Sequence, residues 1–152
     1  MTAPESFEII VAEDNPADVF LVREALKEHG VNCALHVISD GEKALAYIDQ
    51  LDRDPTMPRV DLLILDMHLP KHDGEEILKR LRSTEHLSKT PVIVMTSVDS
   101  TRIEAKAARH AALFFFRKTS TLDEFLELGA VVRAILDQRG NREPPMESTL
   151  AR

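Results

Sequence analysis

Five short runs of apolar and β-branched residues alternate along the chain with segments whose apolar residues recur at helical spacing. The runs that predict strands are 7–12, 32–38, 60–65, 91–95 and 113–116. Short apolar runs of this kind are typical of strands in a sheet that is covered on both faces. Strands separated by helices form parallel sheets with right-handed crossovers. The alternation therefore predicts an α/β fold, a doubly wound parallel sheet with helices on both faces.

Local signals mark the starts of three helices. Asn15 followed by Pro16 is typical of a helix start, because Asn caps well and Pro fits the first helical position. The segments SDGE (39–42) and TLDE (121–124) have the spacing of a capping box. They predict the beginnings of the second and the last helix, and we expect the last helix to end near Gly140.

Length and charge limit the classes of protein to which the chain can belong. The 152 residues suit one domain, and the net charge of −7 argues against nucleic acid or an anionic membrane as main partner. The longest apolar run, 111–116, is far too short to span a membrane, and the first seven residues lack a secretory signal. Cys33 is the only cysteine, so no internal disulfide is possible. We expect a cytoplasmic protein.

The domain boundaries follow from the same pattern. We expect a flexible N-terminus over residues 1–6, one domain over 7–139 and a mobile tail over 140–152. The tail holds two prolines and little that is apolar, which is typical of a segment without a core. It is too short for an output domain.

Polar side chains follow four of the predicted strands, at the point where each strand ends. They are Glu13 and Asp14 after the first, Asp66 after the third, Thr96 and Ser97 after the fourth and Lys118 after the fifth. In an open parallel sheet the binding crevice lies beyond the carboxyl ends of the strands. We therefore expect these side chains to meet at one edge of the sheet.

Three carboxylates in one place repel one another, so either one of them is protonated or a divalent cation neutralises them. Oxygen ligands favour a hard ion, and Mg²⁺ takes one or two carboxylates and completes its shell with water and phosphate oxygens. A lysine and a hydroxyl beside that ion would suit a phosphoryl group, which an aspartate could accept as nucleophile.

Four segments resemble those of response-regulator receiver domains, in the same order and spacing, over roughly residues 7–139. They are IVAEDN (10–15), LILDMHLPKHDG (63–74), PVIVMTS (91–97) and FFRK (115–118). The resemblance implies a flavodoxin-like fold of five parallel strands in order 2-1-3-4-5 with five helices. It also implies a two-component signalling module and not an enzyme. The first two segments look most like single-domain regulators that partner bacterial phytochrome histidine kinases.

The resemblance implies roles for the acids that follow the first and third strands. Asp66 looks like the phosphoacceptor, which takes a phosphoryl group from a phosphohistidine of a sensor kinase. Glu13, Asp14, Asp66 and the backbone carbonyl of His68 look like the ligands of Mg²⁺. The output would be a protein contact or passage of the phosphoryl group to another protein.

The fourth and fifth strands would supply the remaining machinery. Thr96 looks like the switch hydroxyl that binds a phosphoryl oxygen, Lys118 like its cationic partner and Phe115 like the aromatic switch residue. Phe115 stands where tyrosine is frequent, so it has no hydroxyl. In the family the lysine is commonly followed by proline through a cis peptide bond, whereas here Thr119 follows Lys118. A cis bond without proline costs about 2.5–4 kcal/mol, so either the loop bears that strain or the bond is trans and Lys118 is aimed differently.

Each of these residues also has a simpler explanation. Glu13 and Asp14 could be acids at a helix N-terminus, and Asp66 could cap a loop. His68 and His72 invite a zinc site, but no thiolate or third imidazole has matching spacing. The coincidence of the polar residues at four strand ends favours a shared site.

Two other functions compete with the signalling module. An aspartyl-phosphate phosphohydrolase would carry an Asp-x-Asp motif, but His68 stands at the second position and no cap insertion is present. An unphosphorylated docking module would not need the full set of acids, hydroxyl and lysine.

The last predicted helix has a broad apolar face. Two apolar stripes lie side by side on this face. The first consists of Leu122, Phe125, Leu126, Gly129, Val132 and Leu136, and the second, on a neighbouring face, of Leu128, Val131 and Ile135. This face exceeds the arc that one core contact needs. We expect a homodimer through this helix and the side of the fifth strand. The alternative is a helix that is sunk deeply into its own domain.

Overall fold

The computed structural model describes residues 6–97, 101–119 and 121–142, with side chains as far as residue 139. Strands and helices alternate along these residues, as predicted. The strands are β1 (Phe7–Ala12), β2 (Cys33–Ile38), β3 (Leu62–Asp66), β4 (Val92–Thr96) and β5 (Phe114–Arg117). The helices are α1 (Pro16–Glu28), α2 (Gly41–Arg53), α3 (Gly74–Arg82), α4 (Thr101–Arg109) and α5 (Leu122–Arg142).

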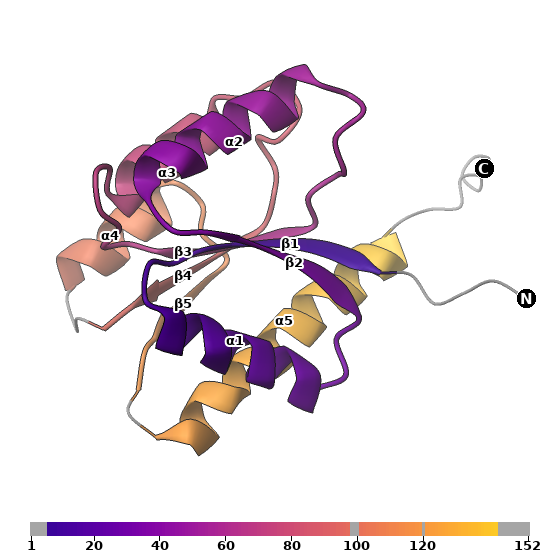
Figure 1. Ribbon diagram of the computed structural model, residues 1–152, viewed down its shortest axis with the longest axis vertical. Helices are drawn as coiled ribbons and strands as arrows, with labels where there is room; N and C mark the ends of the chain where they lie inside the picture. Colours follow the sequence, from indigo (N-terminus) through magenta and orange to yellow (C-terminus); the bar gives the residue numbers. More distant parts are fainter. Residues whose placement is uncertain (1–5, 98–100, 120, 143–152) are drawn as a thin grey trace, which may run out of the picture.

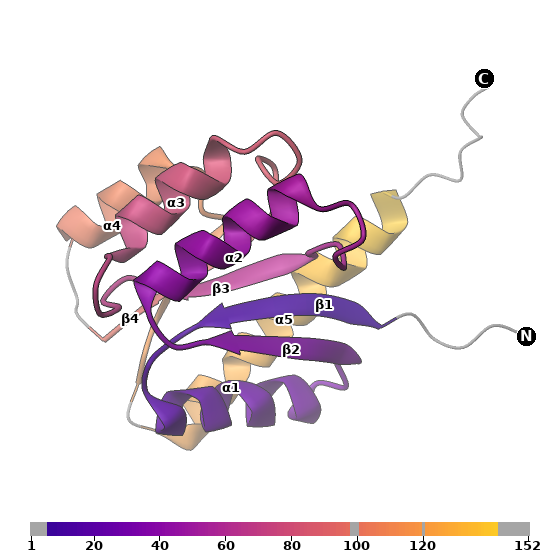
Figure 2. The ribbon, with the colours of Figure 1, turned by 45° about the horizontal axis from the view of Figure 1, so that its top comes forward.

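The strands form one parallel sheet in the order β2-β1-β3-β4-β5, which confirms the predicted flavodoxin-like topology. Helices α2, α3 and α4 cover one face, and α1 and α5 cover the other (Figure 1). In Figure 2, α1 lies below β2 and α5 runs behind the sheet. All five β3 residues are buried, as expected for a central strand covered on both faces.

Each face of the sheet has its own hydrophobic core, because successive side chains of a strand point to opposite faces. Leu63 and Leu65 of β3 join the core beneath α2, α3 and α4, whereas Leu62 and Ile64 join the core beneath α1 and α5. The alternation continues on β5, where Phe115 packs against the first core and Phe116 lies in the second.

Helix α2 begins one residue away from the predicted capping box, so that detail is wrong. The cap is Asp40 and not Ser39: its Oδ1 accepts a hydrogen bond from the backbone N–H of Lys43, at 2.8 Å. The backbone N–H of Gly41 is engaged elsewhere, because it donates to the carbonyl oxygen of Pro70, at 2.9 Å. The connection after β3 therefore rests directly on the start of α2.

Helix α5 begins at Leu122, as predicted, and runs to Arg142, so residues 140–142 are helical and not part of a tail. Most of its apolar face is buried in the core beneath α1 and α5: Phe125, Leu128, Val132 and Leu136. A Cβ on Gly129 would overlap the carbonyl oxygen of Ala25, so α1 and α5 touch through their backbones. The breadth of the face is explained by two neighbours in the same chain, the sheet and α1.

The ends of the chain named in the sequence analysis, residues 1–5 and 143–152, lie outside the described residues. Among the helices of the described part, none is long and apolar enough to cross a membrane.

Candidate phosphoryl and metal site

The predicted site residues converge at the carboxyl edge of the sheet. Glu13 follows β1, Asp66 ends β3 and Thr96 ends β4. The last two strands are joined at this edge by a hydrogen bond of 2.7 Å from the backbone N–H of Lys118 to the carbonyl oxygen of Thr96. Ser97, which was expected beside Thr96, is exposed.

Three carboxylates form the centre of the site. Glu13, Asp14 and Asp66 each offer an oxygen, and these oxygens lie within 4.8 Å of one another. Glu13 and Asp66 are only 1% and 4% exposed, whereas Asp14 faces solvent. Oxygen donors alone, two buried and one open to water, fit a hard divalent cation such as Mg²⁺, which keeps several waters when bound.

The backbone fixes one oxygen of each buried acid. The N–H of Asn15 donates to Glu13 Oε2 at 3.1 Å, and the N–H of His68 donates to Asp66 Oδ1 at 3.0 Å. Each acid then presents its other oxygen to Lys118. The loop that follows β3 thus orients the carboxylate of Asp66 through the backbone of His68.

The ammonium of Lys118 lies among three carboxylates. Its Nζ is 2.8 Å from Glu13 Oε1, 2.8 Å from Asp18 Oδ2 and 3.4 Å from Asp66 Oδ2. Asp18, on the first turn of α1, was not among the predicted site residues. The available signal was its position on the first turn of the helix that begins directly after Glu13 and Asp14.

Burial and charge set the protonation of this group. Burial raises the pKa of Glu13 to about 7, with the charge of Asp66 adding to the effect and the hydrogen bond from Lys118 opposing it. Burial alone would lower the pKa of Lys118, but its close contacts with the carboxylates of Asp18 and Glu13 outweigh it and hold that pKa above its ordinary value. The lysine is therefore charged, and the site carries more negative charge than one ammonium can balance.

The sequence matches the response regulator receiver domain family over residues 9–129. The chain belongs to this family. The match covers β1 to β5 and the first turns of α5, and with them the acids, hydroxyl and lysine of the site.

Two curated relatives illustrate the range of the likeness. Response regulator Rcp1 of Synechocystis sp. is 37% identical over 89 residues, which are 59% of this chain and 60% of that protein. Transcriptional regulatory protein TrcR of Mycobacterium tuberculosis is 30% identical over 142 residues, which are 93% of this chain and 50% of that protein. The chain therefore matches less than two thirds of the length of either relative.

Solved receiver structures share the fold closely. The phosphorylated cyanobacterial phytochrome response regulator RcpA has a TM-score of 0.79 at 27% identity, with 88% of this chain and 96% of that chain covered. The Mn²⁺-bound form of Rcp1 has a TM-score of 0.74 at 27% identity, with coverages of 84% and 92%. A divalent metal in that receiver structure agrees with the acidic group found here.

Two details of the receiver machinery differ from the commonest pattern. No peptide bond among the described residues is cis, so Lys118–Thr119 is trans, and Lys118 nevertheless points at the acids. Phe115 is half-buried against the core beneath α2, α3 and α4. Its ring therefore lies on the side of the sheet that carries α4.

The imidazoles beside the site do not form a metal centre. His72 Nδ1 lies 2.9 Å from Glu76 Oε1, and the side chain of His68 is exposed. Within the described residues, the group of Glu13, Asp14 and Asp66 is the only set of three or more His, Cys, Asp or Glu ligands close enough to hold a metal. The zinc alternative is not supported.

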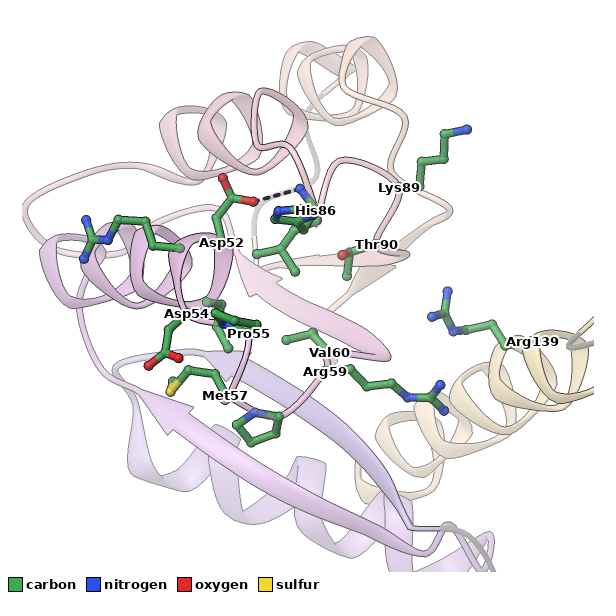
Figure 3. Close-up of a pocket in the computed structure, with 14 residues that line it drawn as sticks. Asp52, Asp54, Pro55, Met57, Arg59, Val60, His86, Lys89, Thr90 and Arg139 are labelled. Atoms are coloured by element: carbon green, nitrogen blue, oxygen red, sulfur yellow. Dashed lines mark hydrogen bonds between the residues drawn. The ribbon is translucent and has the colours of Figure 1, made fainter.

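A cavity of about 520 Å³ lies elsewhere, between the end of α2, the connection from α3 to β4 and the end of α5 (Figure 3). Two cations at its rim pair with a buried acid: Arg59 and Arg139 lie 3.2 and 3.8 Å from Asp61 Oδ1. None of the three acids of the metal group lines this cavity. The site at the carboxyl edge of the sheet is thus separate from this cavity.

Proposed function

We propose that this receiver domain is a phosphorylation-controlled signalling module that accepts a phosphoryl group on Asp66. The observation that carries the proposal is the group around that side chain. Asp66 is buried beside Glu13 and Asp14, and its Oδ2 lies 3.4 Å from the ammonium of Lys118. Phosphoryl transfer needs this arrangement: a nucleophilic carboxylate that lies beside a cation and beside a site for a divalent metal.

In the proposed reaction, a carboxylate oxygen of Asp66 attacks the phosphorus of a phosphohistidine on a sensor kinase. The phosphorus–nitrogen bond breaks, its electron pair returns to the imidazole, and Asp66 becomes an acyl phosphate. Glu13, Asp14, Asp66 and the backbone carbonyl of His68 would hold Mg²⁺, which would supply positive charge to neutralise the phosphoryl oxygens. Lys118 donates a hydrogen bond to one of these oxygens.

Two residues would report the modification to the rest of the domain. The hydroxyl of Thr96, at the end of the buried strand β4, would donate to a phosphoryl oxygen. Phe115 on β5 is half-buried against α4's side of the sheet, and its burial would change with phosphorylation. The output is then a protein contact or passage of the phosphoryl group to another protein, not turnover of a substrate.

The test is phosphorylation by a histidine kinase with Mg²⁺, followed by intact mass and by a gel that retards phosphoproteins. We expect label on the wild type, none on Asp66→Asn and normal label on Asp137→Asn, which removes an exposed acid on α5. Stable labelling of Asp66→Asn would refute the assignment. Rapid turnover of small phosphate esters would instead favour a phosphohydrolase.

The kinase is proposed from the relatives. RcpA is a cyanobacterial phytochrome response regulator and RtBRR a bacteriophytochrome response regulator, and both resemble this chain in fold, which supports a bacteriophytochrome histidine kinase as partner. The exchange is proposed to take place in the cytoplasm. We expect a phytochrome kinase encoded beside this gene to phosphorylate the domain faster than an unrelated kinase does.

A homodimer is proposed for the β5 side of the sheet. β5 is an edge strand, and the residues beside it expose apolar side chains: Leu113 by 60%, Phe114 by 40% and Leu122, at the start of α5, by 54%. A second copy would cover them. Light scattering over a concentration series should show dimers for the wild type and monomers for Leu122→Asp. A wild type that stays monomeric with and without phosphorylation would refute the dimer.

A further inference from the structure

We propose that Asp18 is a positioning residue, which aims the ammonium of Lys118 at the phosphoacceptor. The inference rests on the proposed phosphorylation of Asp66. It concerns a residue on α1 that neither belongs to the group of metal ligands nor touches the phosphoacceptor.

The geometry of the ammonium carries the argument. A lysine has three N–H donors, and here three carboxylates surround them. The contacts to Glu13 and Asp18 are both 2.8 Å, whereas the contact to Asp66 is 3.4 Å. The hydrogen bond to Asp18 fixes the orientation of the ammonium, because a charge-assisted hydrogen bond is strongest near 2.7–2.9 Å. The ion pair with Glu13 is equally short but lacks the geometry of a hydrogen bond. The hydrogen bond to Asp66 is long, so the donor that faces Asp66 is available to a phosphoryl oxygen.

Asp18 and Glu13 differ in what else they can bind. The oxygens of Glu13 lie in the group with Asp14 and Asp66 that can hold a divalent cation, and one of them already accepts the N–H of Asn15. A cation there competes with Lys118 for the charge of Glu13. Asp18 lies outside that group, so a cation held there would not compete directly for its contact with Lys118.

Asp18 is also fixed on a rigid element. The Asn15 side chain caps α1 by accepting the N–H of Ala17 at 2.9 Å, and α1 packs closely on α5 at Gly129. Lys118, in contrast, has a long flexible side chain just beyond the end of β5. The carboxylate of Asp18 is 18% exposed, so little water competes for the contact.

The test measures phosphorylation of the full chain by acetyl phosphate over a range of Mg²⁺ concentrations. In this step Asp66 attacks phosphorus and acetate leaves with the electron pair of the broken bond. We expect Asp18→Asn to lower the maximal rate about tenfold, the scale seen when a partner that orients a functional group is lost. The Mg²⁺ concentration for half-maximal rate should not change, and Asp18→Glu should recover part of the rate.

Glu28→Gln is the matched control, because it removes an exposed acid from the last turn of the same helix. Its rate should equal that of the wild type. A maximal rate of Asp18→Asn equal to or above the wild-type rate would overturn the proposal, as would a parallel loss of Mg²⁺ affinity, which would make Asp18 a metal-site residue. Loss of rate only in proportion to unfolded protein, measured by circular dichroism, would also overturn it.

The two proposals fail differently. If acetyl phosphate labels the wild type no better than Asp66→Asn, phosphorylation of Asp66 itself is wrong. If the wild type is labelled and Asp18→Asn behaves like Glu28→Gln, only the role of Asp18 is wrong. A second measurement, the nuclear magnetic resonance signal of the Lys118 ammonium, should shift in Asp18→Asn and stay in place in Glu28→Gln.

Discussion

Arg82, the last residue of α3, binds two connections of the fold at once. Its guanidinium donates to the carbonyl oxygens of Ser88 and Thr90, at 3.0 and 2.7 Å, and of His110 and Ala111, at 2.8 and 3.1 Å. The first pair precedes β4 and the second precedes β5. We predict that Arg82→Ala destabilises the domain far more than removal of an ordinary surface arginine.

The size of the loss follows from these four contacts. A hydrogen bond to a charged group contributes about 1.5–3 kcal/mol, but exposed carbonyls recover much of this from water. The carbonyl of buried Thr90 recovers little. We therefore expect Arg82→Ala to lower the free energy of unfolding by about 2–4 kcal/mol and Tm by about 4–16 °C. The stability of Arg82→Lys should lie between that of the wild type and that of Arg82→Ala, because an ammonium keeps the charge but not the planar arrangement of donors of a guanidinium.

Arg80 provides the matched control on the same helix. It pairs with Asp49 at 2.6 Å, but both side chains are largely exposed, so Arg80→Ala should cost no more than about 1 kcal/mol. Urea unfolding followed by circular dichroism measures both variants. Equal losses for Arg82→Ala and Arg80→Ala would refute the reasoning, because the carbonyls would then be satisfied equally well by water.

Three further predictions concern packing, pH and metal. Gly129→Ala should lower the free energy of unfolding by about 1–3 kcal/mol through overpacking against α1, although Ala is the better helix former. Ala130→Gly, on the exposed side of α5, should lower it by about 1 kcal/mol. A Gly129→Ala protein that is as stable as the wild type in urea would contradict this prediction. The hydrogen bond with His110 holds the pKa of Glu75 below its ordinary 4.5, so the stability that Glu75 contributes is present above pH 4.5 and is lost as pH falls through its lower folded-state pKa. The urea midpoint of Glu75→Gln should accordingly lie below that of the wild type at pH 7 and approach it in acid. A difference between the two midpoints that grows as the pH falls would contradict this pH dependence. Mg²⁺ at a hundredfold excess over its Kd should raise the wild-type free energy of unfolding by about 2.7 kcal/mol, and chelation should reverse this increase. A thermal scan in which Mg²⁺ stabilises Asp14→Asn as much as the wild type would exclude the proposed ligand set.

The fold and the centre of the site could be predicted because they depend on local patterns. Each strand is a short apolar run with polar residues at its end, and a parallel sheet brings these ends to one edge whatever the details of packing. Glu13, Asp66 and Lys118 therefore meet although they are far apart in the sequence.

Contacts between distant elements could not be predicted in the same way. Asp18 and Lys118 are 100 residues apart, and their contact depends on how α1 lies beside the end of β5. The cap of α2 is Asp40 and not Ser39, and the N–H of Gly41 donates to the connection after β3, a contact that the local spacing does not indicate. The apolar face of α5 was wide because α1 covers part of it, which no pattern within α5 could reveal.

The position of the lysine late in the chain has a consequence for the order of assembly. β1 and β3 pair directly and bring Glu13 and Asp66 together, whereas the cation that partly neutralises them follows β5, at the far edge of the sheet. A nascent chain that has made β3 but not β5 therefore holds two inward-facing acids without their counter-ion. Docking of the last strand reduces this repulsion, so completion of the sheet and partial neutralisation of the acids are one event.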